Sequence, residues 1–147
     1  RPSQVTLLQK ACPMKLLVNQ VEISLARLDC FSDGTVDQCM TEMITPMSWS
    51  PLAAGRLASG APISMQDPQH VRWQKIRDVL DVIARNHAVS RTVIALAWLL
   101  KHPSGIVPIV GSINPERIRD AALATEFELS REEWYRLLEA AYGQRLP

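Results

Sequence analysis

One stretch, residues 106–120, constrains the fold of this chain most, because it changes from an apolar run to a helix start within a few residues. The run, IVPIV, is typical of a strand that is covered on both faces of a sheet. Gly111 and Ser112 then allow a sharp turn, and Asn114 and Pro115 suit the N-cap and first position of a helix. The stretch therefore predicts a buried strand that passes directly into a helix, as in α/β proteins.

The start of this predicted helix carries the groups that hold an anion. The free N–H groups of a first helical turn lie at the positive end of the helix dipole, and Ser112 adds a hydroxyl and Arg117 a guanidinium. These donors can converge on a phosphate just beyond the strand. An ordinary strand-to-helix connection with a solvated arginine is the alternative that the residues leave open.

Composition and charge exclude several classes of protein. A chain of 147 residues with 47% hydrophobic residues has enough apolar side chains for one globular domain. A net charge of +1 gives no electrostatic support for binding nucleic acid or a membrane surface. The sequence contains neither an eighteen-residue apolar run nor the apolar core of a signal peptide, so we expect a cytoplasmic protein. The three cysteines and three histidines lack metal-ligand spacing, which predicts free thiols and no metal site.

The rest of the chain predicts helices that alternate with strands. We expect helices over residues 2–11, 35–43, 68–86 and 90–101, strands over 16–23, 46–50 and 106–110, and two helices after the last strand. Capping boxes are predicted at Thr35 with Gln38 and at Ser130 with Glu133, and Ser90 is predicted to cap the helix over 90–101. In the longest helix, the residues expected on the buried face are Val71, Ile76, Val79, Leu80 and Ile83.

This order of elements predicts parallel strands with crossover helices and a ligand-binding edge at the strand C-termini. Trp49 ends the second strand, where its ring is either part of the core or stacks on an aromatic ligand. Three strands leave open edges and an uncovered face, whereas more units of this kind would close into a barrel. We therefore expect the chain to be part of a β/α barrel, and its abrupt helical start to be a cut end.

Four motifs, in order along the chain, resemble consecutive signatures of the aldo-keto reductases. They are NQVEIS at residues 19–24, SWSPLAAGRL at 48–57, ALAWLL at 95–100 and PIVGSINPERIRD at 108–120. The resemblance is to the bacterial branch with a Trp in the strand-7 motif. It implies an α/β fold in which residues 1–147 are the C-terminal portion of a (β/α)8 TIM barrel, from the helix after strand 5 to the C-terminus, with the first five strands absent.

The resemblance also implies contacts to a nicotinamide cofactor. Gln20 matches the family glutamine that bonds the nicotinamide carboxamide, and Trp49 matches the aromatic residue that stacks on the nicotinamide ring. Ser50, Leu52 and Gly55 match the loop along the pyrophosphate.

At the other end of the cofactor, Ser112 and Arg117 match the contacts to the adenosine 2′-phosphate, which favours NADPH over NADH. Gly111 and Ala121 depart from the lysine and asparagine that many members carry, and Asp120 can serve the acidic position beside Ala121.

The family's catalytic tetrad of Asp, Tyr, Lys and His lies in the part of the barrel that this chain lacks. The only tyrosines, Tyr135 and Tyr142, fall in the last predicted helix, away from any strand end. We therefore expect the cofactor-binding portion of an NADPH-dependent oxidoreductase that reduces aldehydes or ketones to alcohols, and no activity from the chain alone. A non-catalytic NADP-binding or self-associating half-barrel is the alternative. The expected partners are a small carbonyl substrate, which the sequence does not identify, and either the missing half-barrel or a second copy.

Overall fold

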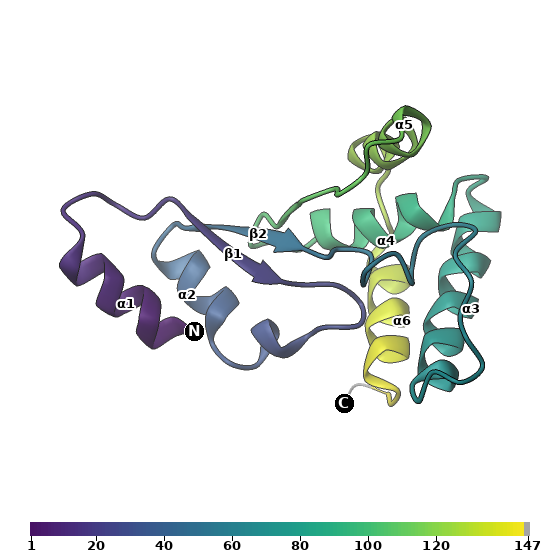
Figure 1. Cartoon of the computed structure of the whole chain (residues 1–147), viewed down its shortest axis with the longest axis horizontal. Helices are drawn as coiled ribbons and strands as arrows, with labels where there is room; N and C mark the ends of the chain where they lie inside the picture. Colours follow the sequence, from purple (N-terminus) through teal and green to yellow (C-terminus); the bar gives the residue numbers. More distant parts are fainter. Residues whose placement is uncertain (146–147) are drawn as a thin grey trace.

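The computed structural model describes residues 1–145 as three strands and eight helical segments (Figure 1). In chain order they are α1 (Pro2–Ala11), β1 (Val18–Glu22), the short 3-10 helix η1 (Asp29–Phe31), α2 (Thr35–Thr41), β2 (Thr45–Trp49), α3 (His70–Asn86), α4 (Arg91–Leu100), β3 (Val107–Pro108), α5 (Pro115–Ala122), the 3-10 helix η2 (Leu123–Thr125) and α6 (Arg131–Tyr142). None of the helices in this described part is long and apolar enough to cross a lipid bilayer.

The three strands form a parallel sheet in the order β1, β2, β3. Gln20 lies opposite Met47, and Met47 lies opposite Val107 on its other side. The predicted third strand is shorter than expected, although the N–H of Ile109 still donates to the Ser48 carbonyl at 2.8 Å. Because the strands are parallel, their C-terminal ends meet at one edge of the sheet.

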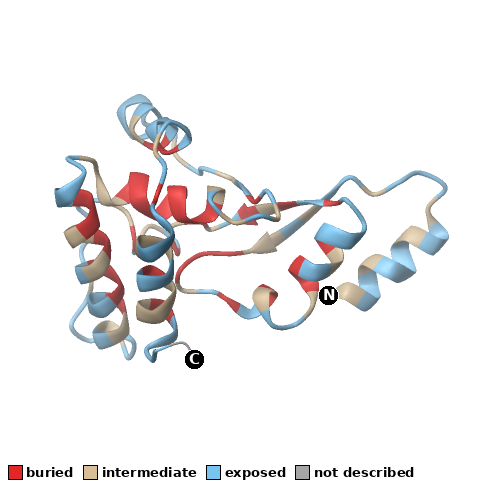
Figure 2. Cartoon of the chain, turned by 180° about the vertical axis from the view of Figure 1, so that it is seen from behind, coloured by how far each residue is buried: buried red, intermediate tan, exposed pale blue. Residues whose placement is uncertain are grey.

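The core lies where α4 packs between α3, α6 and the sheet. Every residue of α4 from Thr92 to Leu99 is buried, as its apolar sequence requires. Figure 2 shows many buried residues in α4 and α3, whereas α1 has none, and α6 adds the buried Leu137 and Ala141. Trp98 and Trp134 stack with ring centroids 5.3 Å apart, and each indole N–H donates to the other residue's carbonyl. This pair fixes α6 against α4.

One face of the sheet packs on helices, and the other is exposed in the described structure. Ser48 and Ile23 are fully buried, whereas Val18, Trp49 and Val107 are 47%, 42% and 44% exposed. The prediction that residues 107–110 are covered on both faces is therefore wrong, because no layer within residues 1–145 covers this second face. A parallel sheet with helices on one side fits part of a (β/α)8 barrel, in which the uncovered face points inward.

Three predicted helix caps are confirmed. The side chains of Ser90, Asn114 and Ser130 accept hydrogen bonds from the first turns of α4, α5 and α6. In α6 the Glu133 carboxylate also accepts from the Ser130 N–H at 2.9 Å, which completes the capping box. These caps fix where each helix begins.

The capping box predicted at Thr35 and Gln38 is wrong. Thr35 is already inside α2, and its N–H donates to the Asp33 carboxylate at 2.8 Å. The Gln38 amide instead donates to the Pro2 carbonyl at 3.1 Å and the Thr6 hydroxyl at 2.9 Å. Gln38 therefore holds α1 against α2.

The buried face of α3 also differs from the prediction. Val71 is 64% exposed, whereas Trp73 and Arg77 are buried. The Arg77 guanidinium donates from Nε to the Arg56 carbonyl at 2.6 Å, so this buried cation serves as an anchor for the loop after β2.

Candidate functional site

The site begins where β2 ends, and buried hydrogen bonds hold this end in place. The Ser48 hydroxyl donates to the Ile23 carbonyl at 2.5 Å, and the Ser48 carbonyl accepts from Ile109. These bonds connect the end of β2 to Ile23, directly after β1, and to Ile109, directly after β3. Trp49 follows directly, on the open face of the sheet, so its ring is held at the strand end and remains partly exposed.

The chain then turns through an unusual backbone conformation. Ser50, Ala53, Ala54 and Gly55 have φ angles of +50°, +52°, +52° and +84°. Only glycine adopts this left-handed region without a steric cost, which is about 1–2 kcal/mol for each other residue. Such strain concentrates in loops that serve a function. A Cβ added to Gly55 would have nothing within 4 Å, so the backbone there borders open space.

A reciprocal pair of hydrogen bonds fastens the next part of this loop to α4. The Ser59 N–H donates to the Thr92 hydroxyl at 3.1 Å, and the Thr92 N–H donates to the Ser59 hydroxyl at 3.3 Å. Beside them, Arg91 binds Asp81 through two bonds of 2.7 and 2.6 Å and reaches the Ala58 carbonyl at 3.3 Å. Residues 58 and 59 are therefore anchored to the start of α4.

The third wall of the site is the start of α5. Asn114 accepts from the N–H groups of Glu116 and Arg117 at 2.9 and 3.3 Å, and its own N–H donates to the Ser112 hydroxyl at 3.2 Å. The expectation that free helix N–H groups hold an anion is therefore wrong, because Asn114 already occupies them. The Ser112 hydroxyl proton and the Arg117 guanidinium remain as donors. No carboxylate in the described part of the chain forms an ion pair with Arg117.

Asp120 links this wall to the core. Its Oδ2 accepts from the Ser90 hydroxyl at 2.7 Å, and Ser90 is at the same time the N-cap of α4. The bond joins α5 to α4 and fixes the direction of the Asp120 side chain.

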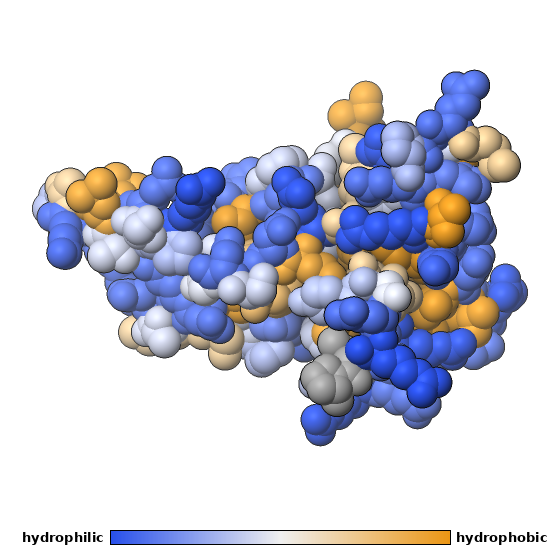
Figure 3. All heavy atoms as spheres, turned by 90° about the horizontal axis from the view of Figure 1, so that it is seen from below, coloured by the Kyte–Doolittle hydropathy of each residue, from blue (hydrophilic) through white to orange (hydrophobic). Residues whose placement is uncertain are grey.

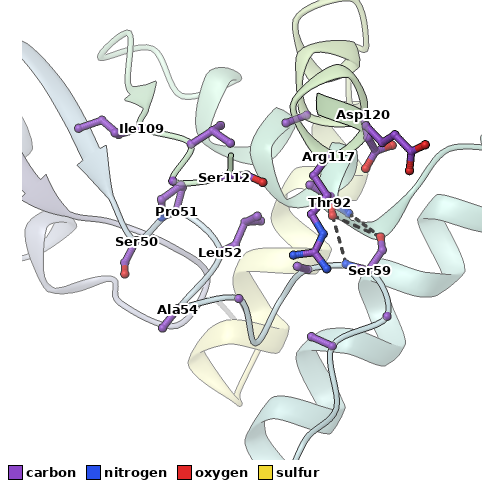
Figure 4. A pocket seen from close by; sticks show the side chains of 18 of the residues that line it. Ser50, Pro51, Leu52, Ala54, Ser59, Thr92, Ile109, Ser112, Arg117 and Asp120 are labelled. Atoms are coloured by element: carbon purple, nitrogen blue, oxygen red, sulfur yellow. Dashed lines mark hydrogen bonds between the residues drawn. The ribbon is translucent and has the colours of Figure 1, made fainter. Parts of the chain in front are cut away.

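These three walls enclose a cavity of about 950 Å³ (Figure 4), at the upper end of the range for small-molecule sites. Seven of the eight predicted cofactor-binding residues line it, namely Trp49, Ser50, Leu52, Gly55, Ser112, Arg117 and Asp120. Arg117 extends from α5 in the direction of Ser59 and Thr92, whereas the Ser50 hydroxyl points away from the centre of the cavity. The cavity lining therefore combines an aromatic ring at the end of β2 with a cation near the start of α5.

Gln20 is the predicted residue that the cavity does not include. It lies on β1, on the same open face of the sheet as Trp49, because Gln20 pairs with Met47 and side chains alternate along β2. Its side chain is exposed there.

Sequence reasoning missed Ser59, Thr92 and Glu116, which also line the cavity. The position of Thr92, two residues after a helix N-cap, was the available signal for a hydroxyl at a helix start. Ser59 gave none, because a serine in a loop rich in glycine and proline has no distinguishing spacing.

The described cavity lining contains no tyrosine, histidine or lysine that could donate a proton to a carbonyl oxygen. Tyr135 and Tyr142 are exposed on α6. Burial lowers the pKa of His102, whose ring bonds the Ser104 hydroxyl at 2.7 Å, and His87 bonds Glu133 at 2.6 Å. Residues 1–145 also contain no cluster of three or more His, Cys, Asp or Glu side chains that could hold a metal ion.

Comparison with known proteins identifies the relatives of this architecture. Residues 2–141 match the model of the aldo/keto reductase family. The chain is 46% identical over 144 residues to a 6-dehydroglucose reductase of Novosphingobium aromaticivorans, covering 98% of this chain and 45% of that protein. It is 37% identical over 146 residues to a 6-dehydroglucose reductase of Agrobacterium fabrum, covering 99% and 46%. The chain thus spans less than half the length of these relatives.

Among solved structures, the aldose reductase of Giardia lamblia superposes with a TM-score of 0.73 at 26% identity, covering 99% of this chain and 43% of that one. The sequence matches and the structural match therefore both lead to reductases of this family.

Proposed function

Because the chain belongs to the aldo-keto reductase family, we propose that its cavity binds NADP(H) and that it is the cofactor-binding portion of an enzyme reducing aldehydes or ketones to alcohols. The observation that carries the proposal is the gathering of seven predicted cofactor residues around one cavity. The cofactor supplies the hydride for such a reduction. The residues of this chain bind and orient it.

Each wall has its own part in the proposed binding. Trp49 offers a flat, partly exposed ring on which a nicotinamide ring stacks, which sets the face that is presented to the substrate. Gly55 and the left-handed turn before it bring the backbone next to the pyrophosphate. Ser112 and Arg117 bind the 2′-phosphate by a hydroxyl donor and a charge-assisted bond.

Gln20 completes the proposed site from β1. Gln20 is exposed on the same open face of the sheet as Trp49, so it would hold the carboxamide of a nicotinamide ring stacked on Trp49. A directional amide contact there fixes the rotation of the ring.

The catalytic proton donor belongs, in this proposal, to a part of the barrel that residues 1–147 do not contain. The chain corresponds to the segment from the helix after strand 5 through strand 8 and the C-terminal helix, and it covers 45% and 46% of the two relatives. Since both are named 6-dehydroglucose reductase, 6-dehydroglucose is the first carbonyl compound to assay with a protein that contains this segment.

Calorimetric titration of the chain with NADP⁺ and NAD⁺ tests the proposed site. Arg117→Ala should weaken NADP⁺ binding by about 1.5–3 kcal/mol, the range for hydrogen bonds to charged groups, and leave NAD⁺ binding nearly unchanged. Arg119→Ala is the matched control, because Arg119 is also exposed on α5 but does not line the cavity. Equal losses for both nucleotides would place Arg117 away from the 2′-phosphate.

A further inference from the structure

The end of the cavity that α5 forms carries more negative than positive charge. Its lining there contains Glu116, Arg117 and Asp120, which have formal charges of −1, +1 and −1. Neither Glu116 nor Arg117 takes part in an ion pair within the described structure. The α5 end of the cavity therefore contributes one cation and two carboxylates to its lining.

The helical spacing places these three side chains beside one another. Glu116 and Asp120 are four residues apart and Arg117 and Asp120 are three apart, so each of the first two is a neighbour of Asp120 on α5, and all three line the same cavity. Asp120 is held toward the core by its bond to Ser90 at 2.7 Å. Asn114 accepts from the backbone N–H of Glu116, but the Glu116 carboxylate itself forms no hydrogen bond or ion pair within residues 1–145 and is exposed at the cavity.

We propose that Glu116 is a specificity-determining residue, which limits the preference of this cavity for a 2′-phosphorylated nucleotide over an unphosphorylated one. This inference rests on the proposed function. Arg117 attracts the phosphate, and the adjacent Glu116 carboxylate repels it, so the net discrimination between NADP(H) and NAD(H) is smaller than the arginine alone would give.

The role of Glu116 in the helix itself does not depend on a ligand. As an acidic residue in the first turn, it also complements the dipole of α5. A test must therefore separate the loss of helix stability from the loss of phosphate repulsion. α6 offers the means, because Glu132 lies at the same position after its own N-cap, is exposed, and does not line the cavity.

The experiment compares Glu116→Gln with the control Glu132→Gln by calorimetric titration with 2′,5′-ADP, 5′-AMP, NADP⁺ and NAD⁺. Glutamine keeps the size of the side chain and removes its charge. At low ionic strength, Glu116→Gln should tighten binding of 2′,5′-ADP and NADP⁺ roughly three- to tenfold and change 5′-AMP and NAD⁺ by less than twofold. The gain should shrink in about 0.5 M salt, because the Debye length falls well below 8 Å. Glu132→Gln should change none of the four affinities.

Other outcomes separate the two proposals. Measurable binding of NADP⁺ with no change in its preference over NAD⁺ in Glu116→Gln overturns the role of Glu116 and leaves the proposed function intact. An equal gain in Glu132→Gln also overturns it, since the effect would then follow the overall charge. If the unaltered chain binds none of the four nucleotides, the proposed function fails and this inference fails with it.

Discussion

Single residues at this site owe their positions to backbone contacts that lie several residues away. Trp49 is held at the strand end because Ser48, its neighbour, is bonded to the chain on both sides. Arg117 is held at the cavity because Asn114 begins the helix where it does. These contacts fix the backbone from which each side chain extends, so the main chain does not have to be ordered when a ligand binds, which favours affinity.

Trp49 provides a prediction at this scale. Trp49→Ala should weaken NADP⁺ binding by about 1–3 kcal/mol, the range measured for stacking of a base on an aromatic side chain. It should leave 2′,5′-ADP binding unchanged, because that ligand has no nicotinamide ring. Titration of both ligands checks this, with Trp49→Phe as the variant that retains a ring. A loss of affinity for 2′,5′-ADP as large as that for NADP⁺ would show that Trp49 supports the cavity and does not stack on nicotinamide.

All three cysteines are free thiols, and they differ in burial. Cys30 and Cys39 are buried and Cys12 is half-buried. Burial and, to a smaller extent, the nearby Asp33 raise the pKa of Cys30 to about 12. Burial also raises the pKa of Cys39. Neither buried thiol is therefore suited to act as a nucleophile near neutral pH.

At the scale of elements, the sequence predicts best what depends on near neighbours. Ser90, Asn114 and Ser130 were predictable as caps because each bonds N–H groups two or three residues away. Gln38 was not, because its partner Pro2 is 36 residues distant and the same local pattern also fits a capping box. A contact between residues far apart in the sequence thus decides whether Gln38 caps its own helix or binds another one, which the local sequence does not determine.

A hydrogen bond between His87, at the end of α3, and Glu133, in the first turn of α6, is a pH-sensitive connection between these helices, and we call it the clasp. His87 bonds the Glu133 carboxylate at 2.6 Å. Partial burial alone would raise the pKa of Glu133, but the hydrogen bonds from His87 and Ser130 outweigh it and leave this pKa below its usual range. A carboxyl group with a lowered pKa stabilises the fold above its unfolded pKa, and this contribution is lost as the pH falls through the folded pKa.

The prediction for this clasp follows from the sign of that shift. Between pH 6 and pH 3, the unaltered chain should lose more stability than Glu133→Gln, by on the order of 0.5–1 kcal/mol for a partly exposed pair. Glutamine keeps the capping position but does not titrate. Urea unfolding at a series of pH values measures the difference, and Glu132→Gln serves as the control. Parallel pH profiles for the unaltered chain and Glu133→Gln would show that the clasp contributes nothing measurable.

The whole molecule has two surfaces that a complete α/β domain would cover. One is the open face of the sheet, and the other is the outer side of α1, where Leu7 and Leu8 are 70% and 55% exposed. Figure 3 shows apolar residues at the surface both at the α1 end of the molecule and along its middle. The apolar run at residues 106–110 predicted a strand with two covered faces, which would hold only where a second layer is present. The number of strands in the sheet cannot be predicted from such a run. An apolar run indicates that a strand is buried, but it does not show which other strands pair with it.

The last prediction concerns this uncovered sheet. Val18, Trp49 and Val107 lie on its open face, and the outer edges of β1 and β3 have unpaired backbone groups within the described structure. Fully burying a large apolar side chain contributes roughly 1.5–3 kcal/mol, so three side chains that stay a little under half exposed together forfeit roughly 2–4 kcal/mol. This is a large share of the roughly 5–15 kcal/mol that stabilises a whole domain. We therefore expect the purified chain either to form a dimer or higher oligomer through this face, or to adopt a loosely packed state that binds a hydrophobic dye.

Sedimentation velocity over a range of concentrations, dye binding and urea unfolding together test this expectation. Val107→Thr should weaken the association or reduce dye binding, because it makes the open face more polar. Val71→Thr is the matched control, since Val71 is 64% exposed on α3 and lies outside the sheet. A monomer whose sedimentation does not change with concentration, which unfolds cooperatively and binds no dye, would contradict the prediction. Residues 1–147 would then bury their core unaided, and their proposed place as one portion of a larger barrel would have to be given up.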